Sequence, residues 1–265
     1  MEYPKIETLY NRDEKFNVIE GNYRLPEFKL VDKWFVTEKI DGVNVQIHYY
    51  PDLVGTGQGH SDWFELMKFN GMKVDFFGRT EKTQFHPSLL DYLKKTFTVE
   101  KLGSVFEAKN ENNGESCKPE AWLFMEGYGH KIQKGGNYRS DISCRLFDVY
   151  IPDKKNNPMG GWWLKPEAIE NIALKLGIQT VPTIGIFDTH NAVLMVSGEF
   201  DARNVDGLNF FTPQVSVVAF LDGGTENYLA EGIVARTVPM LFTRRGERLM
   251  WKLKVKDFKH GEKSL

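Results

Sequence analysis

Reactive polar side chains interrupt an apolar stretch near the N-terminus. Residues 34–50 read WFVTEKIDGVNVQIHYY, in which apolar and polar residues alternate on both sides of EKIDG. This alternation predicts two short strands, and Asp41 followed by Gly42 is a common turn pair. The local pattern leaves two interpretations open: a β-hairpin with an ordinary Asp-Gly turn, or a turn that presents Lys39 as a nucleophile.

More charged residues lie at the ends of later strand patterns. Taken singly, each has an ordinary structural explanation, such as a surface ion pair, a turn cap or the solvated face of an edge strand. Taken together, they are residue types that bind nucleotide phosphates and a metal ion. They are Arg79, Glu126, Asp148, Glu231, Lys252 and Lys254.

Such a set supports amine attack on phosphorus. A lysine amine attacks only when it is unprotonated, and cationic neighbours or desolvation favour the neutral form. Lys252 and Lys254 are expected to supply these cations and to neutralise charge on an α-phosphate. Glu231 and Asp148 are expected to hold magnesium, which prefers carboxylate, water and phosphate oxygens.

The nucleoside of such a substrate also needs partners. Glu126 is expected to accept hydrogen bonds from ribose hydroxyls. Phe147 offers an aromatic face for a base, and its apolar setting is equally typical of a core phenylalanine.

Strands outnumber helices among the elements that must position these residues. Strands are expected at residues 74–80, 121–129, 141–151, 231–237 and 248–255. Helical periodicity predicts helices at residues 87–97 and 165–178, whereas residues 215–221 suit a strand or a helical turn. Strands and helices do not alternate regularly, so an α+β fold with antiparallel sheets is favoured over a doubly wound parallel sheet.

Composition limits the partners. The 34 lysines and arginines against 36 acidic residues give a net charge of -2, so a nucleic-acid surface must be local. Residues 243–265 carry eight basic and three acidic residues. Cys117 and Cys144 lack the spacing of metal ligands or of a disulfide framework. With no run long enough to span a bilayer, the sequence predicts a reducing, cytoplasmic setting and no membrane partner.

An ordered series of six motifs makes the sequence resemble the ATP-dependent RNA ligase family of covalent nucleotidyltransferases. EKIDGVN is similar to the family's K-x-D-G-x-N motif, FFGRT to its next element, and LFMEGYGHKIQKGGNYR to its ribose-contacting glutamate motif and tail. LFDVY, AEGIVAR and WKLK follow in family order, as far as residue 254. The resemblance implies an α+β, ATP-grasp-like nucleotidyltransferase domain, with antiparallel sheets flanked by helices.

The resemblance also implies a reaction. Lys39 would take AMP from ATP, with Mg²⁺ or Mn²⁺, and pass it to a polynucleotide 5′-phosphate before a 3′-hydroxyl displaces it. The implied catalytic residues are Lys39, Asp41, Asn44, Arg79, Lys252 and Lys254. The implied nucleotide-binding residues are Glu38, beside the adenine, with Lys39, Arg79, Glu126, Phe147, Glu231, Lys252 and Lys254. The implied metal ligands are Glu231 and Asp148.

The same resemblance favours RNA over DNA as the nucleic-acid partner. Asn44 stands where DNA ligases and capping enzymes usually have arginine, and the tail after Glu126 is similar to the RNA ligase branch. Lys131, Lys134 and Arg139 in this tail are candidates for phosphate contacts or for solvated loop positions. A DNA nick-sealing ligase, a guanylyltransferase and a catalytically silent nucleic-acid-binding module remain alternatives.

One nucleotidyltransferase domain is expected over residues 1–265, with an irregular lead-in at residues 1–33. Only residues 255–265 follow the closing K-x-K motif, so no C-terminal OB-fold or other appended domain is expected. The insert at residues 51–75 or an accessory protein, such as an end-processing enzyme, would compensate; otherwise ligation would be weak.

Overall fold

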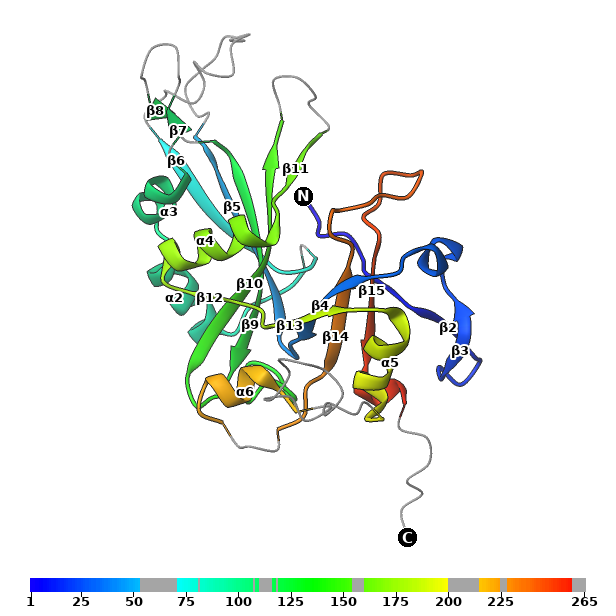
Figure 1. Cartoon of the computed structure of the whole chain (residues 1–265). Helices are drawn as coiled ribbons and strands as arrows, with labels where there is room; N and C mark the ends of the chain where they lie inside the picture. The colour runs from blue at the N-terminus through cyan, green and yellow to red at the C-terminus, as the bar shows by residue number, and fades with distance from the viewer. Residues whose placement is uncertain are drawn as a thin grey trace. The chain divides into compact units, whose positions relative to one another are not determined.

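The structure, a computed structural model, describes most of the chain (Figure 1). The described residues are 1–52, 71–80, 82–106, 119–153, 160–199, 215–224 and 228–258, with the backbone of 108–109 and 116–117. They cluster into two compact units: Met1–Tyr3, Gly42–Gln133 and Asp141–Thr180 form the first, and Pro4–Asp41, Lys134–Ser140 and Val181–Leu265 the second. The expectation of one domain over residues 1–265 stays a prediction. Within the described part, no helix is long and apolar enough to cross a membrane.

The first unit is built on a six-stranded sheet. Its strands run in the order β11 (Gly161–Trp163), β10 (Ile142–Pro152), β9 (Ala121–Gly129), β5 (Val43–Pro51) and β6 (Met72–Phe77), and β12 (Gln179–Thr180) also pairs with β10. All these pairs are antiparallel except β10 with β12. A separate ribbon pairs β7 (Ala108–Lys109) with β8 (Ser116–Cys117).

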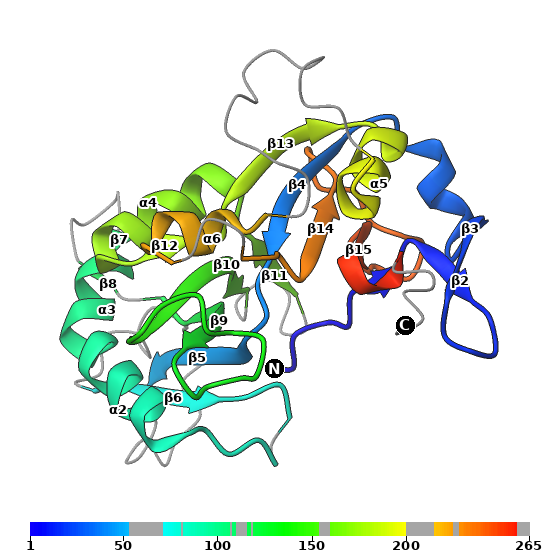
Figure 2. The same ribbon diagram turned by 90° about the horizontal axis from the view of Figure 1, so that it is seen from below.

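Three helices pack on one face of this sheet: α2 (Pro87–Thr96), α3 (Val99–Phe106) and α4 (Pro166–Leu176) (Figure 2). They bury the apolar positions that helical periodicity predicts, because residues three or four apart share a helix face. These include Leu89, Leu93, Ile169, Ala173 and Leu176. Gly177 ends α4 in the left-handed conformation, with φ at 64°.

The second unit contains a five-stranded sheet. Its order is β1 (Glu7–Thr8), β15 (Met250–Lys254), β14 (Gly232–Arg236), β4 (Trp34–Lys39) and β13 (Thr183–Phe187). Only β1 pairs in parallel, with β15. The other elements are the ribbon of β2 (Tyr10–Arg12) and β3 (Val18–Tyr23), helices α5 (Thr189–Ser197) and α6 (Val217–Leu221), and 3₁₀ turns η1 (Pro26–Leu30) and η3 (Val255–Asp257).

The α+β class, the five expected strands and both expected helices are confirmed. Residues 215–221, which suited a strand or a helix, contain helix α6, and Ser216 caps it by accepting a hydrogen bond from the Ala219 N–H. The expectation of an irregular lead-in at residues 1–33 is wrong, because this stretch contains β1, β2, β3 and η1. The sequence VIEGNY of β3 buries only Val18, so no apolar alternation indicated this strand.

The hairpin interpretation of residues 34–50 is also wrong. β4 pairs with β14 and β13, whereas β5 pairs with β9 and β6, so the two strands belong to different sheets. The segment between them carries the chain from one sheet to the other. Local alternation predicted both strands correctly but contains no information about which partners they choose. Most of the insert at residues 51–75 lies outside the described residues.

Gly42 has a packing role rather than a turn role. A Cβ atom at this position would lie 2.5 Å from the Gly127 carbonyl oxygen and 2.8 Å from Cγ of Glu126, both on β9. Its φ is not in the left-handed region. Glycine is therefore needed here because the start of β5 approaches the β9 backbone closely.

Gly42→Ala is expected to lower the free energy of unfolding by about 1–3 kcal/mol, because the added methyl group overpacks the β5–β9 contact. Urea unfolding measures this loss. Gly71→Ala is the control, since the nearest atoms to its Cβ among the residues that the structure describes belong to the Asp52 side chain, the closest at 3.2 Å. Equal losses in the two variants would contradict the packing role of Gly42.

Candidate active site

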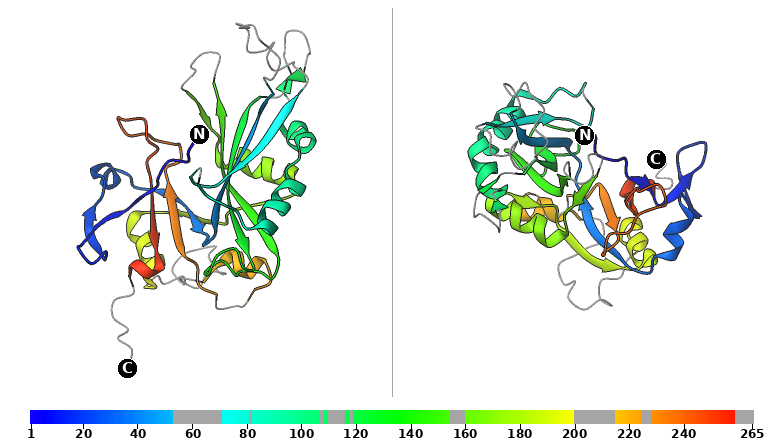
Figure 3. Two further views of the ribbon diagram at one scale, coloured as in Figure 1. Left: turned by 180° about the vertical axis from the view of Figure 1, so that it is seen from behind. Right: turned by 90° about the horizontal axis from the view of Figure 1, so that it is seen from above.

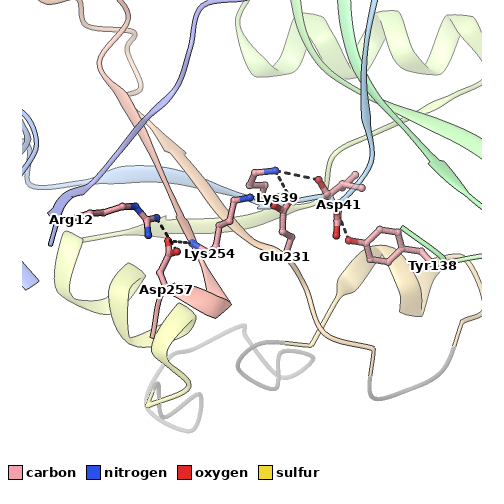
Figure 4. A network of polar contacts seen from close by, with 8 residues as sticks. Arg12, Lys39, Asp41, Tyr138, Glu231, Lys254 and Asp257 are labelled. Atoms are coloured by element: carbon pink, nitrogen blue, oxygen red, sulfur yellow. Dashed lines mark hydrogen bonds and ion pairs between the residues drawn. The ribbon is translucent and has the colours of Figure 1, made fainter. Parts of the chain in front are cut away.

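Lys39 is presented by the end of a strand. It is the last residue of β4 and lies opposite Gly232, the first residue of β14. Its amine forms an ion pair with the Glu231 carboxylate and lies 3.5 Å from the Ile40 carbonyl oxygen (Figure 4). The Lys39 side chain is 21% exposed, so the amine is shielded yet reachable from solvent.

Glu231 bridges two lysines from different strands. One carboxylate oxygen contacts Nζ of Lys39, and the other contacts Nζ of Lys254 (Figure 4). Strand register explains this meeting: Gly232 lies opposite both Lys39 on β4 and Lys254 on β15. Three residues separated by up to 215 positions in sequence therefore meet at one end of three adjacent strands.

Lys252 lies on the same strand and face as Lys254, because side chains two residues apart on a strand point to the same side. Trp251 and Leu253 alternate with them and are buried, while both lysines are half-buried. The K-x-K motif therefore orients two cations to one face of β15. This is the arrangement expected for residues that contact a phosphate.

The pKa of Glu231 reflects opposing influences. Burial would raise the pKa, but the charge of Lys39 and the hydrogen bonds from both lysines outweigh burial and lower it. Glu231 is therefore a stable anion between two cations at neutral pH.

Asp257 anchors the backbone at Lys254. Its carboxylate accepts a hydrogen bond from the Lys254 N–H at 3.0 Å. It also forms an ion pair with Nη2 of Arg12 at 2.9 Å. The Asp257 side chain is only 2% exposed, so the pair is shielded from solvent. Sequence reasoning missed both residues, since Arg12 lies in the stretch expected to be irregular. The spacing of three residues between Lys254 and Asp257 is typical of a carboxylate that accepts a hydrogen bond from a backbone N–H, and this spacing could have indicated Asp257.

The backbone of Asp41 is held by the tail of the glutamate motif. Its N–H donates a hydrogen bond to the Tyr138 hydroxyl at 2.8 Å (Figure 4). Tyr138 is buried and lies 4.9 Å from the ring of Tyr228, whose hydroxyl donates to the Gly135 carbonyl at 2.8 Å. Burial raises the pKa of Tyr138, so its hydroxyl stays protonated. This tail thus restrains the segment that follows Lys39.

The cations of this tail have different surroundings. Lys131 and Lys134 are exposed, whereas Arg139 is half-buried and lies 3.8 Å from the Asp222 carboxylate. Phosphate contacts by all three stay predictions.

Glu38 holds the start of helix α6. Its buried carboxylate accepts hydrogen bonds from the Ser216 hydroxyl and from two backbone N–H groups, at 2.8 Å from Val217 and 3.1 Å from Val218. A carboxylate is favourable there, because the first N–H groups of a helix lack intrahelical partners. The adenine contact expected of Glu38 stays a prediction.

The first unit brings Asn44 and Glu126 together. They lie opposite each other on β5 and β9. Asn44 also accepts a hydrogen bond from Gln46, which donates another to the Gly78 carbonyl at 3.2 Å. Gly78 precedes the exposed Arg79, so the buried side-chain amide of Gln46 links the motif that contains Asn44 to the motif that contains Arg79.

Asp148 and Phe147 lie at an irregularity in β10, where the register with β9 shifts. Asp148 is 1% exposed and accepts a hydrogen bond from the Tyr3 hydroxyl. The Tyr3 ring also packs edge-on against Phe147, with centroids 5.2 Å apart. Sequence reasoning missed Tyr3. The described residues contain no cluster of three or more histidines, cysteines and acids, so a metal role for Asp148 stays a prediction.

A family model now connects these observations. The model of the RNA ligase family matches residues 32–254. The chain belongs to this family. The match includes Lys39, Glu231 and Lys254, and it ends on the K-x-K motif. No curated protein sequence matches the chain.

Solved structures of a Naegleria gruberi RNA ligase share this fold. A Naegleria gruberi RNA ligase mutant with ATP and Mn has a TM-score of 0.51 and 16% identity, over 96% of this chain and 57% of that chain. The same ligase with PPi has a TM-score of 0.51 and 17% identity, over 95% and 61%. This chain therefore spans about three fifths of the length of these ligases.

Glu231→Gln is expected to lower the free energy of unfolding by roughly 1–3 kcal/mol at pH 7, because it leaves two half-buried lysines without their anion. The pKa of Glu231 is lowered by folding, so its stabilisation is present above the ordinary value of 4.5 and is lost as the pH falls through the folded value. The difference between wild type and variant should shrink by pH 3. Urea unfolding at both pH values measures it.

Glu170→Gln is the matched control, because Glu170 is exposed on α4. It should stay close to the wild type at both pH values. A Glu231→Gln loss that is the same at pH 7 and pH 3 would contradict the ion-pair account.

Proposed function

We propose that this chain is an ATP-dependent RNA ligase that joins 5′-phosphate and 3′-hydroxyl ends through a lysyl-AMP. One observation carries the proposal: an RNA ligase family chain places the Lys39 amine against Glu231 and Lys254, at the ends of three paired strands. Two lysine amines and one carboxylate thus meet at one site, which supports a reaction at a phosphate.

Lys39 performs the first step on ATP. Its Nζ attacks the α-phosphorus, an N–P bond forms, the P–O bond to pyrophosphate breaks, and the amine loses its proton. The amine must first leave the ion pair with Glu231, because its nitrogen lone pair has to reach the phosphorus. Lys252 and Lys254, on one face of β15, neutralise charge on the phosphate.

The next two steps use the same residues. An oxygen of the RNA 5′-phosphate attacks the lysyl-AMP phosphorus, the N–P bond breaks, and Lys39 regains its amine. The RNA 3′-hydroxyl then attacks the 5′-phosphorus, a phosphodiester forms, and AMP leaves. Asp41 and Asn44 organise these groups, and Arg79 contacts the ribose or the attacking end. Tyr138 and Asp257 act as positioning residues, since they hold the backbone at Asp41 and Lys254.

A divalent metal suits the anion of this site. Magnesium binds through one or two carboxylates together with water and substrate phosphates, so Glu231 alone can provide a protein ligand and Asp148 is a second proposed one. When bound, the metal neutralises charge on the phosphates. The Naegleria gruberi ligase structures with ATP and Mn support ATP and a divalent ion for this chain.

Three residues are proposed to contact the nucleoside. Glu38 lies beside the adenine, Phe147 stacks on it, and Glu126 binds the ribose. RNA is the proposed substrate, supported by the family match and by Asn44 in the nucleophile motif. The cysteine pattern supports a cytoplasmic setting. An accessory or end-processing protein is a proposed partner.

Lys39→Ala is expected to abolish a covalent AMP adduct, because alanine has no nucleophile. Intact mass after incubation with ATP and magnesium measures the adduct in protein first stripped of AMP. Lys33→Ala, which removes an exposed lysine of the same unit, should keep it. No adduct on the wild type would favour the silent binding-module alternative, and an adduct formed only from GTP would favour a guanylyltransferase.

RNA-containing nicks are expected to be sealed in preference to matched all-DNA nicks, because Asn44 and the Glu126 tail follow the RNA ligase pattern. Sealing of 5′-labelled strands, read on denaturing gels, compares the two substrates. Wild type already loaded with AMP removes the first step from the comparison. Preferential sealing of the all-DNA nick would replace RNA by DNA as the proposed substrate.

A further inference from the structure

The turn that joins β14 to β15 forms an ordered hairpin, here called the β14–β15 hairpin, residues 237–249 (Figure 3, left). Its arms are tied by a bridge between Phe242 and Arg248 and by the Leu249 N–H, which donates to the Leu241 carbonyl at 2.8 Å. At its tip, the Thr243 N–H donates a backbone hydrogen bond to the Glu247 carbonyl at 2.8 Å. The Thr243 hydroxyl also accepts from the Glu247 N–H. The tip is therefore held in one conformation.

Basic side chains gather at the tip of this hairpin. Arg244 and Arg245 are both exposed, and among the residues that the structure describes neither guanidinium has a hydrogen-bond or ion-pair partner. The hairpin contains three arginines and one acidic residue, Glu247, in a chain whose net charge is -2. The tip is therefore a local positive surface on a chain without a general positive field.

The same hairpin carries exposed apolar side chains. Phe242 is 53% exposed, and Leu241 and Val238 are 47% and 51% exposed. Paired cations beside an exposed aromatic ring match a polynucleotide, because phosphates bind guanidinium groups and unstacked bases stack on aromatic rings. An acidic protein partner would use the charges but would not specifically need the ring.

The hairpin lies at the end of β14 and β15 that is opposite to the Lys39 site. Glu231 and Lys254 flank one end of the strand pair, and the hairpin leaves the other end, after Arg236 and before Met250. With five residues in β14, the separation along the strands is roughly 16 Å. A group bound at the tip is therefore remote from the reacting phosphate.

We propose that the β14–β15 hairpin is an RNA-binding surface, on which Arg244 and Arg245 contact backbone phosphates and Phe242 stacks on an unpaired base. The inference rests on the proposed RNA ligase function and adds a contact away from the site of chemistry. The hairpin raises affinity for the polynucleotide and takes no part in lysyl-AMP formation.

Arg244→Ala combined with Arg245→Ala tests the phosphate contacts. A 5′-phosphorylated single-stranded RNA, titrated in fluorescence anisotropy without ATP over a range of KCl concentrations, measures affinity and its salt slope. Loss of two phosphate contacts should flatten the log–log salt slope by about 1.4 and weaken binding roughly 25-fold at about 0.1 M salt. The AMP adduct, read by intact mass, should form as in the wild type.

Lys94→Ala combined with Lys95→Ala is the matched control. Both lysines are exposed in the last turn of α2, and the change in net charge is the same. This variant should bind RNA like the wild type. Phe242→Ala tests stacking separately, and it should weaken binding roughly fivefold or more with the salt slope unchanged.

The possible results separate this inference from the proposed function. Wild-type RNA affinity and salt slope in the Arg244 and Arg245 variant would overturn the inference, as would equal losses in the control or no salt-dependent RNA binding by the wild type. Absence of an AMP adduct on the wild type would overturn the ligase proposal alone, because RNA binding is measured without ATP.

Discussion

The ion-pair bridge from Lys39 through Glu231 to Lys254 is the interaction on which the candidate site depends. It forms because β4, β14 and β15 are paired in a register that brings Lys39, Gly232 and Lys254 level. A shift of one residue in any of these strands would turn a charged side chain to the opposite face. Backbone pairing therefore determines which charges meet, and the charges hold the three strand ends together.

Contacts around this bridge restrain the backbone on either side of it. Glu38, next to Lys39, holds the start of α6, and Tyr138 holds the N–H of Asp41. On β15, Asp257 holds the N–H of Lys254 and is itself paired with Arg12. These contacts restrain Lys39 and Lys254 at strand ends, which position side chains more precisely than loops do.

The Glu231 carboxylate has two competing roles, one in the resting protein and one in the proposed reaction. Glu231 neutralises Lys39 and Lys254, and the proposed reaction needs both lysines for the nucleotide and Glu231 for a metal. In the proposed reaction, ATP and a divalent ion would replace these internal ion pairs with contacts to phosphate and to the metal. The three side chains are only partly buried, so their ion pairs can be exchanged without leaving a fully buried charge unpaired.

The sequence alone was enough to predict the family and the strands that carry its motifs. Six short motifs in order predicted the family and Lys39, and periodicity predicted helices α2 and α4 and the strands that carry the motifs. Only the tertiary structure showed that β4 and β5 belong to different sheets, that Gly42 is required by its contact with β9, and that Arg12, Asp257 and Tyr138 support the site. The reason is physical: periodicity reports which face of an element is buried, whereas strand partners and ion pairs arise between residues far apart in the chain.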